Sequence, residues 1–220
     1  MYQPPHFRED RLEVQHGLIR AHPLGLLVTA GPGGLMANAI PFTLETTAGP
    51  HGLLRAHLAR ANSQWREFDG TLECMVLFQG PDSYITPSWY ASKAETHKVV
   101  PTWNYAMVHA WGTPSVHDDA TWLRRQIGQL TLERERSRAT PWAVSDAPEA
   151  FIDGQMRGIV GIEMPITRIE GKWKVSQNRP EADIAGVHAG LVADQGVACP
   201  MANLVAERGG LGTRHKKTSA

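Results

Sequence analysis

The sequence predicts a mainly β protein with peripheral helices, an α+β fold built on an antiparallel barrel. Short apolar runs follow one another through the middle of the chain and are separated by short turns, as in antiparallel sheets. Helical spacings of apolar residues occur at the front, in one insertion and at the rear. The 220 residues, 42% of them hydrophobic, are enough for one sizeable domain.

The first third of the chain is predicted to hold one helix and three strands. Leu12 and Ile19 share a helical face, and this helix ends before Pro23. Residues 24–30 and 34–45 predict a hairpin around the turn Gly-Pro-Gly-Gly at 31–34. Residues 51–56 predict a third strand. Because no helix follows the glycine-rich turn, it does not indicate a dinucleotide-binding fingerprint.

The middle of the chain predicts further strands and one capped helix. Residues 72–79 form an apolar strand, Tyr84 and Ile85 a brief one, and a helical turn follows Pro87. A long strand is expected over residues 104–117. Asp118 or Asp119 then caps a helix in which apolar residues recur at helical spacing.

The last third predicts a helix from Pro148, a two-stranded hairpin turning at Glu170-Gly171, and a helix from Pro180. A weaker helix follows Cys199, and an unstructured Gly/Lys tail ends the chain. We expect one domain over residues 1–195 and a C-terminal extension over residues 196–220.

Composition restricts the classes of function. Lys+Arg and Asp+Glu both number 22, so net charge does not support direct DNA binding, although a local basic patch is compatible with it. No apolar stretch is long enough to cross a bilayer and no signal peptide is evident, so we expect a cytoplasmic protein. The two cysteines have no metal spacing, and we expect no metal site.

The stretch HLARANSQW at 57–65 is a candidate anion site. An apolar strand runs into a helix start at Asn62 or Ser63, both good N-cap residues. Unpaired amides at a helix start attract negative charge, and His57 and Arg60 lie just upstream. The alternative is an ordinary N-cap beside a solvated arginine.

Two aromatic and polar runs form a second candidate site. TPSWYASK contains Trp89 and Tyr90, and VVPTWNY contains Thr102, Trp103 and Asn104. Trp and Tyr combine an apolar body with a polar tip, so they often line ligand pockets and subunit interfaces. The alternative is a structural corner covered by aromatic side chains.

The segment KWKVSQN at 172–178 is the third candidate. In a strand, Lys172, Lys174 and Ser176 share one face, with Gln177 on the other. Lys174 and Ser176 could therefore offer donors to a flavin ring or its phosphate. An exposed lysine edge that discourages aggregation is an equally good interpretation.

No pattern indicates a catalytic nucleophile. The chain has neither GxSxG nor HExxH, and its ten histidines show no metal-binding pair. We therefore expect no catalytic side chain of a recognisable type.

Eight motifs in order resemble the PaiB-type, FMN-binding negative transcriptional regulator family. They are PPHFRED, IRAHPLG, GLMANAIPF, HLARANSQW, LFQGPDSYITPSWYASK, THKVVPTWNYAMVHAWG, IVGIE and GKWKVSQNRPEAD. The resemblance extends from the N-terminus to Leu191 and implies a split antiparallel β-barrel similar to pyridoxamine-phosphate oxidase-like flavoproteins. It also implies a homodimer that holds FMN in grooves between the subunits.

By this resemblance, the motif at 57–65 provides the phosphate side of the FMN site, and the other two runs approach it. The implied cofactor-binding residues are His57, Arg60, Ala61, Asn62, Trp89, Tyr90, Thr102, Trp103, Asn104, Lys174, Ser176 and Gln177.

The expected function is FMN-binding negative regulation of transcription, with flavin sensed through the homodimer. One alternative is an FMN-dependent oxidoreductase or flavin reductase, since flavin itself carries the hydride chemistry. A binding module for another ligand, such as haem, is a third interpretation.

Overall fold

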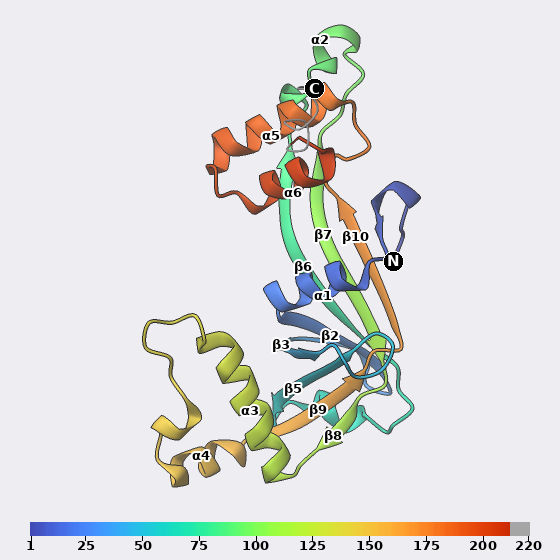
Figure 1. Ribbon diagram of the computed structural model, residues 1–220. Helices are drawn as coiled ribbons and strands as arrows, with labels where there is room; N and C mark the ends of the chain where they lie inside the picture. Colours follow the sequence, from blue (N-terminus) through green and yellow to red (C-terminus); the bar gives the residue numbers. More distant parts are fainter. Residues whose placement is uncertain (212–220) are drawn as a thin grey trace. The chain divides into compact units, whose positions relative to one another are not determined.

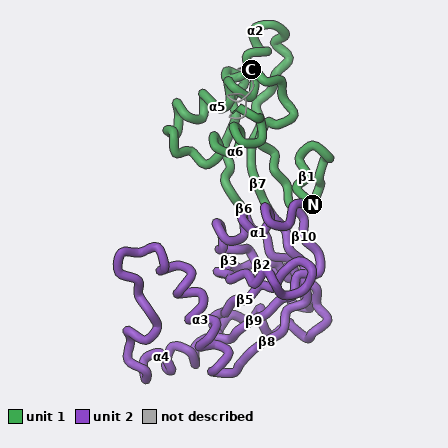
Figure 2. The backbone as a smooth tube through the Cα atoms, viewed as in Figure 1, with its two compact units in different colours: residues 1–10, 79–107, 171–220 green, residues 11–78, 108–170 purple. Residues whose placement is uncertain are grey.

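The computed structural model describes residues 1–211, and the predicted tail beyond them lies outside the described residues. The chain divides into two compact units (Figure 2). Unit 1 comprises residues 1–10, 79–107 and 171–220, and unit 2 comprises residues 11–78 and 108–170.

Ten strands and six α-helices make up the regular structure of the described residues (Figure 1). The strands are β1 (Arg8–Glu9), β2 (Leu24–Gly31), β3 (Gly34–Pro41), β4 (Thr43–Glu45), β5 (Leu53–Ala59), β6 (Cys74–Ile85), β7 (Thr102–Gly112), β8 (Ser115–His117), β9 (Ile159–Pro165) and β10 (Arg168–Lys174). The helices are α1 (Leu12–Ala21), α2 (Ser92–Thr96), α3 (Ala120–Glu135), α4 (Glu149–Met156), α5 (Glu181–Gln195) and α6 (Pro200–Gly209). Short 3₁₀ helices are η1 (Pro5–Phe7), η2 (Ser63–Glu67), η3 (Pro87–Trp89) and η4 (Val144–Asp146).

The strands form two sheets, one of order β1-β10-β7-β6-β2-β3 and one of order β4-β5-β9-β8. The strand pairs with a defined register are all antiparallel, which confirms the predicted class. Within residues 1–211, however, neither strand order returns to its own start. The predicted barrel is therefore not closed by strand pairing in the chain as described.

The predicted hairpin forms as β2 and β3, with Gly31 paired to Gly34 at the turn. Its buried face includes Leu27 and Thr29. The other face is apolar as well: Leu24 is 63% exposed and Leu35 is 82% exposed. Both faces of this hairpin thus carry apolar side chains, although unit 2 covers only one.

Several predicted boundaries are wrong. The strand predicted over 34–45 is divided into β3 and β4, which lie in different sheets. Residues 79–85 continue the strand β6, since proline is compatible with extended backbone where the ladder does not need its N–H. The predicted strand over 104–117 is divided into β7 and β8 near Pro114. The turn between β9 and β10 lies at 166–167 and not at Glu170-Gly171. It is held there by a hydrogen bond from the backbone N–H of Thr167 to the carbonyl of Trp111 (2.9 Å).

Unit 2 buries apolar side chains in its sheets and between its helices. Leu27, Leu54, Phe78 and Ile162 are fully or almost fully buried in its sheets. Residues of α3 and α4 form a hydrophobic cluster, made of Trp122, Leu123, Ile152 and Met156 with partly buried neighbours. The predicted cap of α3 is present: the carboxylate of Asp119 accepts from the backbone N–H of Trp122 (2.8 Å).

Unit 1 is built around α5, which packs against α6 (Figure 1). The predicted apolar residues of α5, Ile184, Val187 and Leu191, are buried. η3 also packs on this helix, where Trp89 lies directly over Gly186 and Gly190. Helix α6, which lies within the predicted C-terminal extension, thus packs against α5. No helix among residues 1–211 is long and apolar enough to span a bilayer.

Candidate functional site

The motif at 57–65 forms the end of β5 and the start of η2 in unit 2. As predicted, the side chain of Asn62 caps the helix, accepting from the backbone N–H of Gln64 (3.0 Å). The helix is, however, a five-residue 3₁₀ segment and not an α-helix. Its dipole is correspondingly short, so the helix start contributes little to anion binding.

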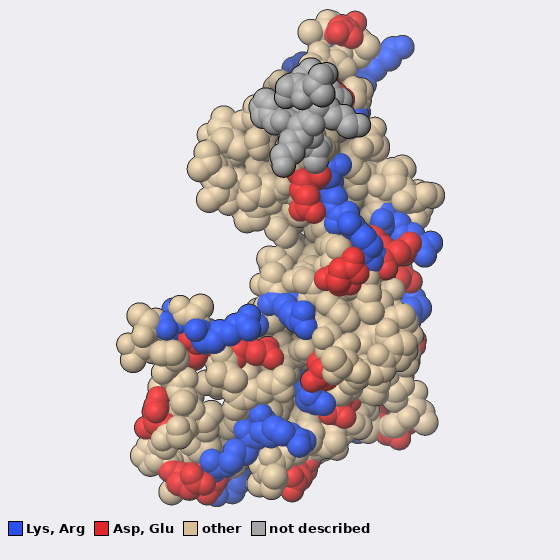
Figure 3. Space-filling view, in the orientation of Figure 1, with Lys and Arg blue, Asp and Glu red and all other residues tan. Residues whose placement is uncertain are grey.

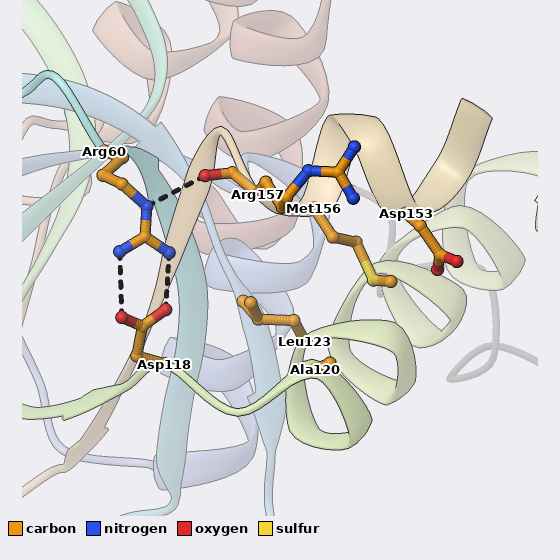
Figure 4. Close-up of a pocket in the computed structure, with 7 residues that line it drawn as sticks. All are labelled: Arg60, Asp118, Ala120, Leu123, Asp153, Met156 and Arg157. Atoms are coloured by element: carbon orange, nitrogen blue, oxygen red, sulfur yellow. Dashed lines mark hydrogen bonds and ion pairs between the residues drawn. The ribbon is translucent and has the colours of Figure 1, made fainter. Parts of the chain in front are cut away.

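The guanidinium of Arg60 is held by protein oxygens (Figure 4). Nη1 and Nη2 donate to the two carboxylate oxygens of Asp118, at 2.9 and 2.5 Å. Nε donates to the carbonyl of Arg157 (2.9 Å), and Nη2 also donates to that of Ile159 (3.0 Å). The Arg60 hydrogen bonds hold the pKa of Asp118 below its usual value.

Arg60 borders a pocket of about 350 Å³ that also contains Asp118, Asp153 and Arg157. Two cations and two carboxylates therefore line it, together with the apolar side chains of Leu123 and Met156 (Figure 4). The charges in this pocket balance one another. An anion at Arg60 would have to compete with Asp118.

Other residues of the same motif have structural partners. Nδ1 of His57 lies 2.8 Å from the Oε1 of Gln126, and Ala61 is exposed. Gln64 is completely buried and donates to the carbonyl of Leu27 (3.1 Å), while its Oε1 accepts from Asn38 (2.9 Å). Gln64 thus fixes the motif to the β2–β3 hairpin.

A second pocket, of about 200 Å³, lies within unit 1 and unites residues from the other two predicted runs. Its polar lining consists of Tyr90, Thr102, Asn104, Lys174, Ser176 and Arg179, with Asn178 beside them. We call it the unit-1 pocket. Five predicted site residues, far apart in the sequence, therefore meet at one place.

Lys174 ends β10 and connects it to β7. Its ammonium donates to the hydroxyl of Thr102 (2.5 Å) and to the carbonyl of Trp103. Burial lowers the pKa of Lys174, and the positive charges of Lys172 and Arg179 lower it further. The pocket is therefore electropositive, and among residues 1–211 no Asp or Glu lines it.

Asn104 and Ser176 form a buried pair. The amide of Asn104 donates to the hydroxyl of Ser176 (2.9 Å), which donates back to the amide oxygen (3.2 Å). Ser176 has a φ of 67°, a left-handed conformation that costs a non-glycine residue about 1 kcal/mol or more. Ser176 also lies beyond the last residue of β10, so the strand alternation predicted for it does not apply.

Tyr90 carries a buried hydroxyl that makes no hydrogen bond of good geometry among residues 1–211, although the guanidinium of Arg179 lies close enough to act on its pKa. The side chain is 3% exposed, and the guanidinium of Arg179 lies 4.8 Å from the centre of its ring. Burial raises the pKa of this hydroxyl. The proton of this hydroxyl is therefore available to a ligand or a water molecule in the pocket.

Three predicted residues of the second and third runs lie outside this lining, as do the four of the first. Trp89 packs on α5, and Trp103 is 54% exposed and contacts Tyr84 edge to face. The side-chain amide of Gln177 donates to the carbonyl of His6 (3.1 Å), and its oxygen accepts from the backbone N–H of Val175 (2.8 Å). Gln177 thereby stabilises the loop after β10.

Sequence reasoning missed Phe7, Asn178 and Arg179 in the pocket and Asp118 beside Arg60. Arg179 directly follows the third candidate segment, and its place before the helix-starting Pro180 was an available signal. Asp118 lies 58 residues from Arg60, and only the pairing of the folded elements brings the two together.

Comparisons with known proteins agree with a flavin site. Residues 1–168 match a family model described as "Putative FMN-binding domain". The chain is 36% identical to an uncharacterised protein of Emericella nidulans, over 95% of this chain and 98% of that protein. It is 30% identical to the protease synthase and sporulation protein PAI 2 of Bacillus subtilis, over 85% and 87% of the two chains.

The fold is also found among solved structures. The FAD and haem binding protein from Mycobacterium smegmatis superposes with a TM-score of 0.54 at 16% identity, covering 76% of this chain and 73% of that protein. The similarity supports the antiparallel α+β fold predicted from the sequence.

Proposed function

The chain belongs to the PaiB-type family of FMN-binding domains, whose cofactor is FMN, and we propose that it regulates transcription as a flavin-dependent homodimer. Family membership rests on the match over residues 1–168 and on the Bacillus subtilis relative. The regulatory role is suggested by the name of that relative, which refers to protease synthesis and sporulation.

The unit-1 pocket is the observation that best supports flavin binding. FMN carries a phosphate, a ribityl chain with hydroxyls, and an aromatic ring. Lys174, Arg179 and the buried hydroxyl of Tyr90 match the charge and polarity of such a ligand. When bound, flavin supplies hydride and electron transfer, while the protein binds and orients it.

The remaining predicted cofactor residues stay proposals. Arg60 lines the 350 Å³ pocket of unit 2, Asn62 follows it at the start of η2, and His57 lies upstream on β5. Because Asp118 already holds Arg60, we propose Arg60 as a secondary flavin contact.

The homodimer is supported by an apolar surface on the β2–β3 hairpin. In the register of this pair, two rows of apolar residues face the same way: Leu24, Leu26, Val28 and Ala30 opposite Pro41, Ala39, Ala37 and Leu35. Leu24, Leu26 and Leu35 are among the exposed large hydrophobic residues. We call this surface the apolar hairpin face. Continuous exposed apolar surface is typical of a protein interface, and two copies of one chain most often pair symmetrically.

The charge distribution favours regulation through a partner over direct contact with DNA. Acidic side chains lie among the basic ones on the face shown in Figure 3. The chain has 22 residues of each sign, whereas DNA-binding surfaces need clustered positive charge. We propose that flavin occupancy alters the dimer and thereby a further contact.

Titration of the purified protein with FMN tests the proposal. We expect saturable quenching of flavin fluorescence and a shift of the visible flavin absorbance. The variant Arg60→Ala should bind FMN more weakly, and an unchanged affinity would remove Arg60 from the site.

Rapid reduction of the bound flavin by NADPH or NADH would favour the oxidoreductase over the regulator. Absence of any flavin binding would overturn the proposal.

A further inference from the structure

We propose that the unit-1 pocket is an oxyanion site in which Lys174, Arg179 and the hydroxyls of Tyr90 and Thr102 hold a phosphate group. Two sources present such a group: the phosphate of FMN, for which the inference rests on the proposed function, and free inorganic phosphate. Both sources present the same tetrahedral anion to the same donors, and the experiment below separates them.

The charge of the pocket is the first step. Lys174 and Arg179 line it without an acidic neighbour in the lining, and neither forms an ion pair within residues 1–211. Asp183, whose charge acts on Tyr90, has both carboxylate oxygens occupied by the N–H and hydroxyl of Ser92 (2.9 and 2.7 Å). The two cations of the lining outnumber this one nearby carboxylate, and a net positive charge in a partly buried pocket attracts an anion.

The donors of the pocket are the second step. Lys174 uses two N–H groups on Thr102 and Trp103, so its third N–H remains for a ligand. The Thr102 hydroxyl accepts from Lys174 and keeps its own proton to donate. The Tyr90 hydroxyl is buried, and because the nearby guanidinium of Arg179 can only donate, the hydroxyl proton has no acceptor among residues 1–211. A phosphate oxygen would satisfy this donor, whose burial is otherwise unfavourable.

The rigidity and size of the pocket are the third step. The reciprocal Asn104–Ser176 pair fixes the loop after β10 in its left-handed conformation. The volume of about 200 Å³ is below the roughly 300–1,000 Å³ of pockets that enclose a whole drug-sized ligand. The pocket is thus suited to a compact group such as a phosphate and not to a flavin ring.

Arg60 in unit 2 provides the contrast. Its guanidinium faces a carboxylate in a bidentate pair and also donates to two carbonyl oxygens. The pocket at Arg60 therefore contains as many carboxylates as cations, whereas the unit-1 pocket has cations alone. This difference assigns the phosphate to the unit-1 pocket.

The first experiment compares FMN with riboflavin, which lacks the phosphate. Dissociation constants are measured by flavin fluorescence for the full-length protein, for Lys174→Met, and for the exposed control Lys98→Met. If the pocket holds the FMN phosphate, Lys174→Met should weaken FMN binding by about tenfold or more and leave riboflavin binding unchanged. Lys98→Met should change neither.

The second experiment uses inorganic phosphate without flavin. Phosphate should raise the melting temperature of the flavin-free protein relative to chloride of equal ionic strength, and Lys174→Met should abolish this shift. A phosphate shift that depends on Lys174, combined with unchanged FMN affinity, assigns the pocket to free phosphate. If phosphate raises the melting temperature but the protein binds neither FMN nor riboflavin, the proposed function is overturned and the oxyanion site is upheld.

Tyr90→Phe separates binding from folding. Removal of a buried hydroxyl that makes no hydrogen bond of good geometry should leave the melting temperature of the ligand-free protein unchanged or higher. The affinity of Tyr90→Phe for phosphate should nevertheless be about three- to tenfold lower than that of the parent protein. The proposal is overturned if Lys174→Met and Tyr90→Phe change neither FMN affinity nor the phosphate shift, or if Lys174→Met weakens FMN and riboflavin equally.

Discussion

At the scale of single residues, buried polar side chains decide how the candidate motifs are held. In the run HLARANSQW, Gln64 looks like an ordinary polar helix residue, yet it has no exposed surface in the structure. Its amide joins η2 to both strands of the β2–β3 hairpin, through Leu27 and Thr29 on one and Asn38 on the other. The motif therefore has a structural role besides any contact with ligand.

We expect Gln64→Ala to lower the free energy of unfolding by about 2–4 kcal/mol, because it leaves several buried polar partners unpaired and opens a cavity. The measurement is urea unfolding followed by circular dichroism. Ser63→Ala is the matched control, since Ser63 is exposed and adjacent. Equal stability of the two variants would contradict the structural role of Gln64.

His109 on β7 predicts a pH dependence of stability. Burial lowers its pKa, and its Nε2 is buried without a partner among residues 1–211. The unfolded state therefore binds a proton more readily than the folded state. Its contribution to stability should be complete above the unfolded pKa of about 6.5 and be lost as the pH falls through the lower folded pKa.

The variant His109→Gln should remove this part of the acid loss. Urea midpoints measured at pH 7.5 and at pH 5 should therefore differ less in the variant than in the parent protein. Replacement of the exposed His97 in the same way should leave the difference unchanged. An equal loss of stability in parent and His109→Gln would exclude His109 as its source.

At the scale of elements, close approach of α5 and η3 depends on two glycines. A Cβ at Gly186 would lie 2.0 Å from the carbonyl oxygen of Trp89, and one at Gly190 would lie 2.3 Å from its ring. η3 ends at the residue before Tyr90, and α5 begins two residues after Arg179. The packing of α5 against η3 therefore positions Tyr90 in the unit-1 pocket. Trp89, predicted as a cofactor contact, has this packing role in the structure.

We expect Gly186→Ala to destabilise the protein by about 1–3 kcal/mol, since the clash is with backbone and exceeds the gain in helix propensity. Gly128→Ala in α3 is the matched control, because nothing lies within 4 Å of its Cβ position. It should stabilise by about 0.5–1 kcal/mol. Thermal unfolding compares the pair, and stabilisation by both substitutions would contradict the close packing.

Periodic elements could be predicted and interrupted ones could not. α1, α3 and α5 and the β2–β3 hairpin follow from apolar spacing and turn residues, which are local signals. The continuation of β6 through Pro81 and the turn at 166–167 depend on tertiary pairing, which outweighs local turn preference.

The candidate site was predictable to the same extent. Motif chemistry singled out Tyr90, Thr102, Asn104, Lys174 and Ser176, and they share one pocket. The pairing of Arg60 with Asp118 and the buried hydroxyl of Tyr90 are properties of the folded chain. No spacing in the sequence reports which polar groups are satisfied.

At the scale of the whole molecule, the apolar hairpin face carries the prediction of a dimer. A strand with apolar residues on both faces is normally covered on both, and within residues 1–211 the face bearing Leu24 and Leu35 stays exposed. A second copy of the chain, paired through the same face, would cover it on both protomers at once.

Sedimentation equilibrium should therefore give about 48 kDa, twice the 24.2 kDa of one chain. The double variant Leu24→Glu/Leu35→Glu should shift the mass to that of the monomer, because it places charge in an apolar interface. Both side chains are exposed within one chain, at 63% and 82%, so folding should be preserved. Leu132→Glu, 68% exposed on α3, is the control and should remain dimeric. If the flavin binds between subunits, the double variant, which loses the dimer, should also bind FMN more weakly. Leu132→Glu should keep the FMN affinity of the parent protein. A parent protein of 24.2 kDa at micromolar concentration would rule out the dimer.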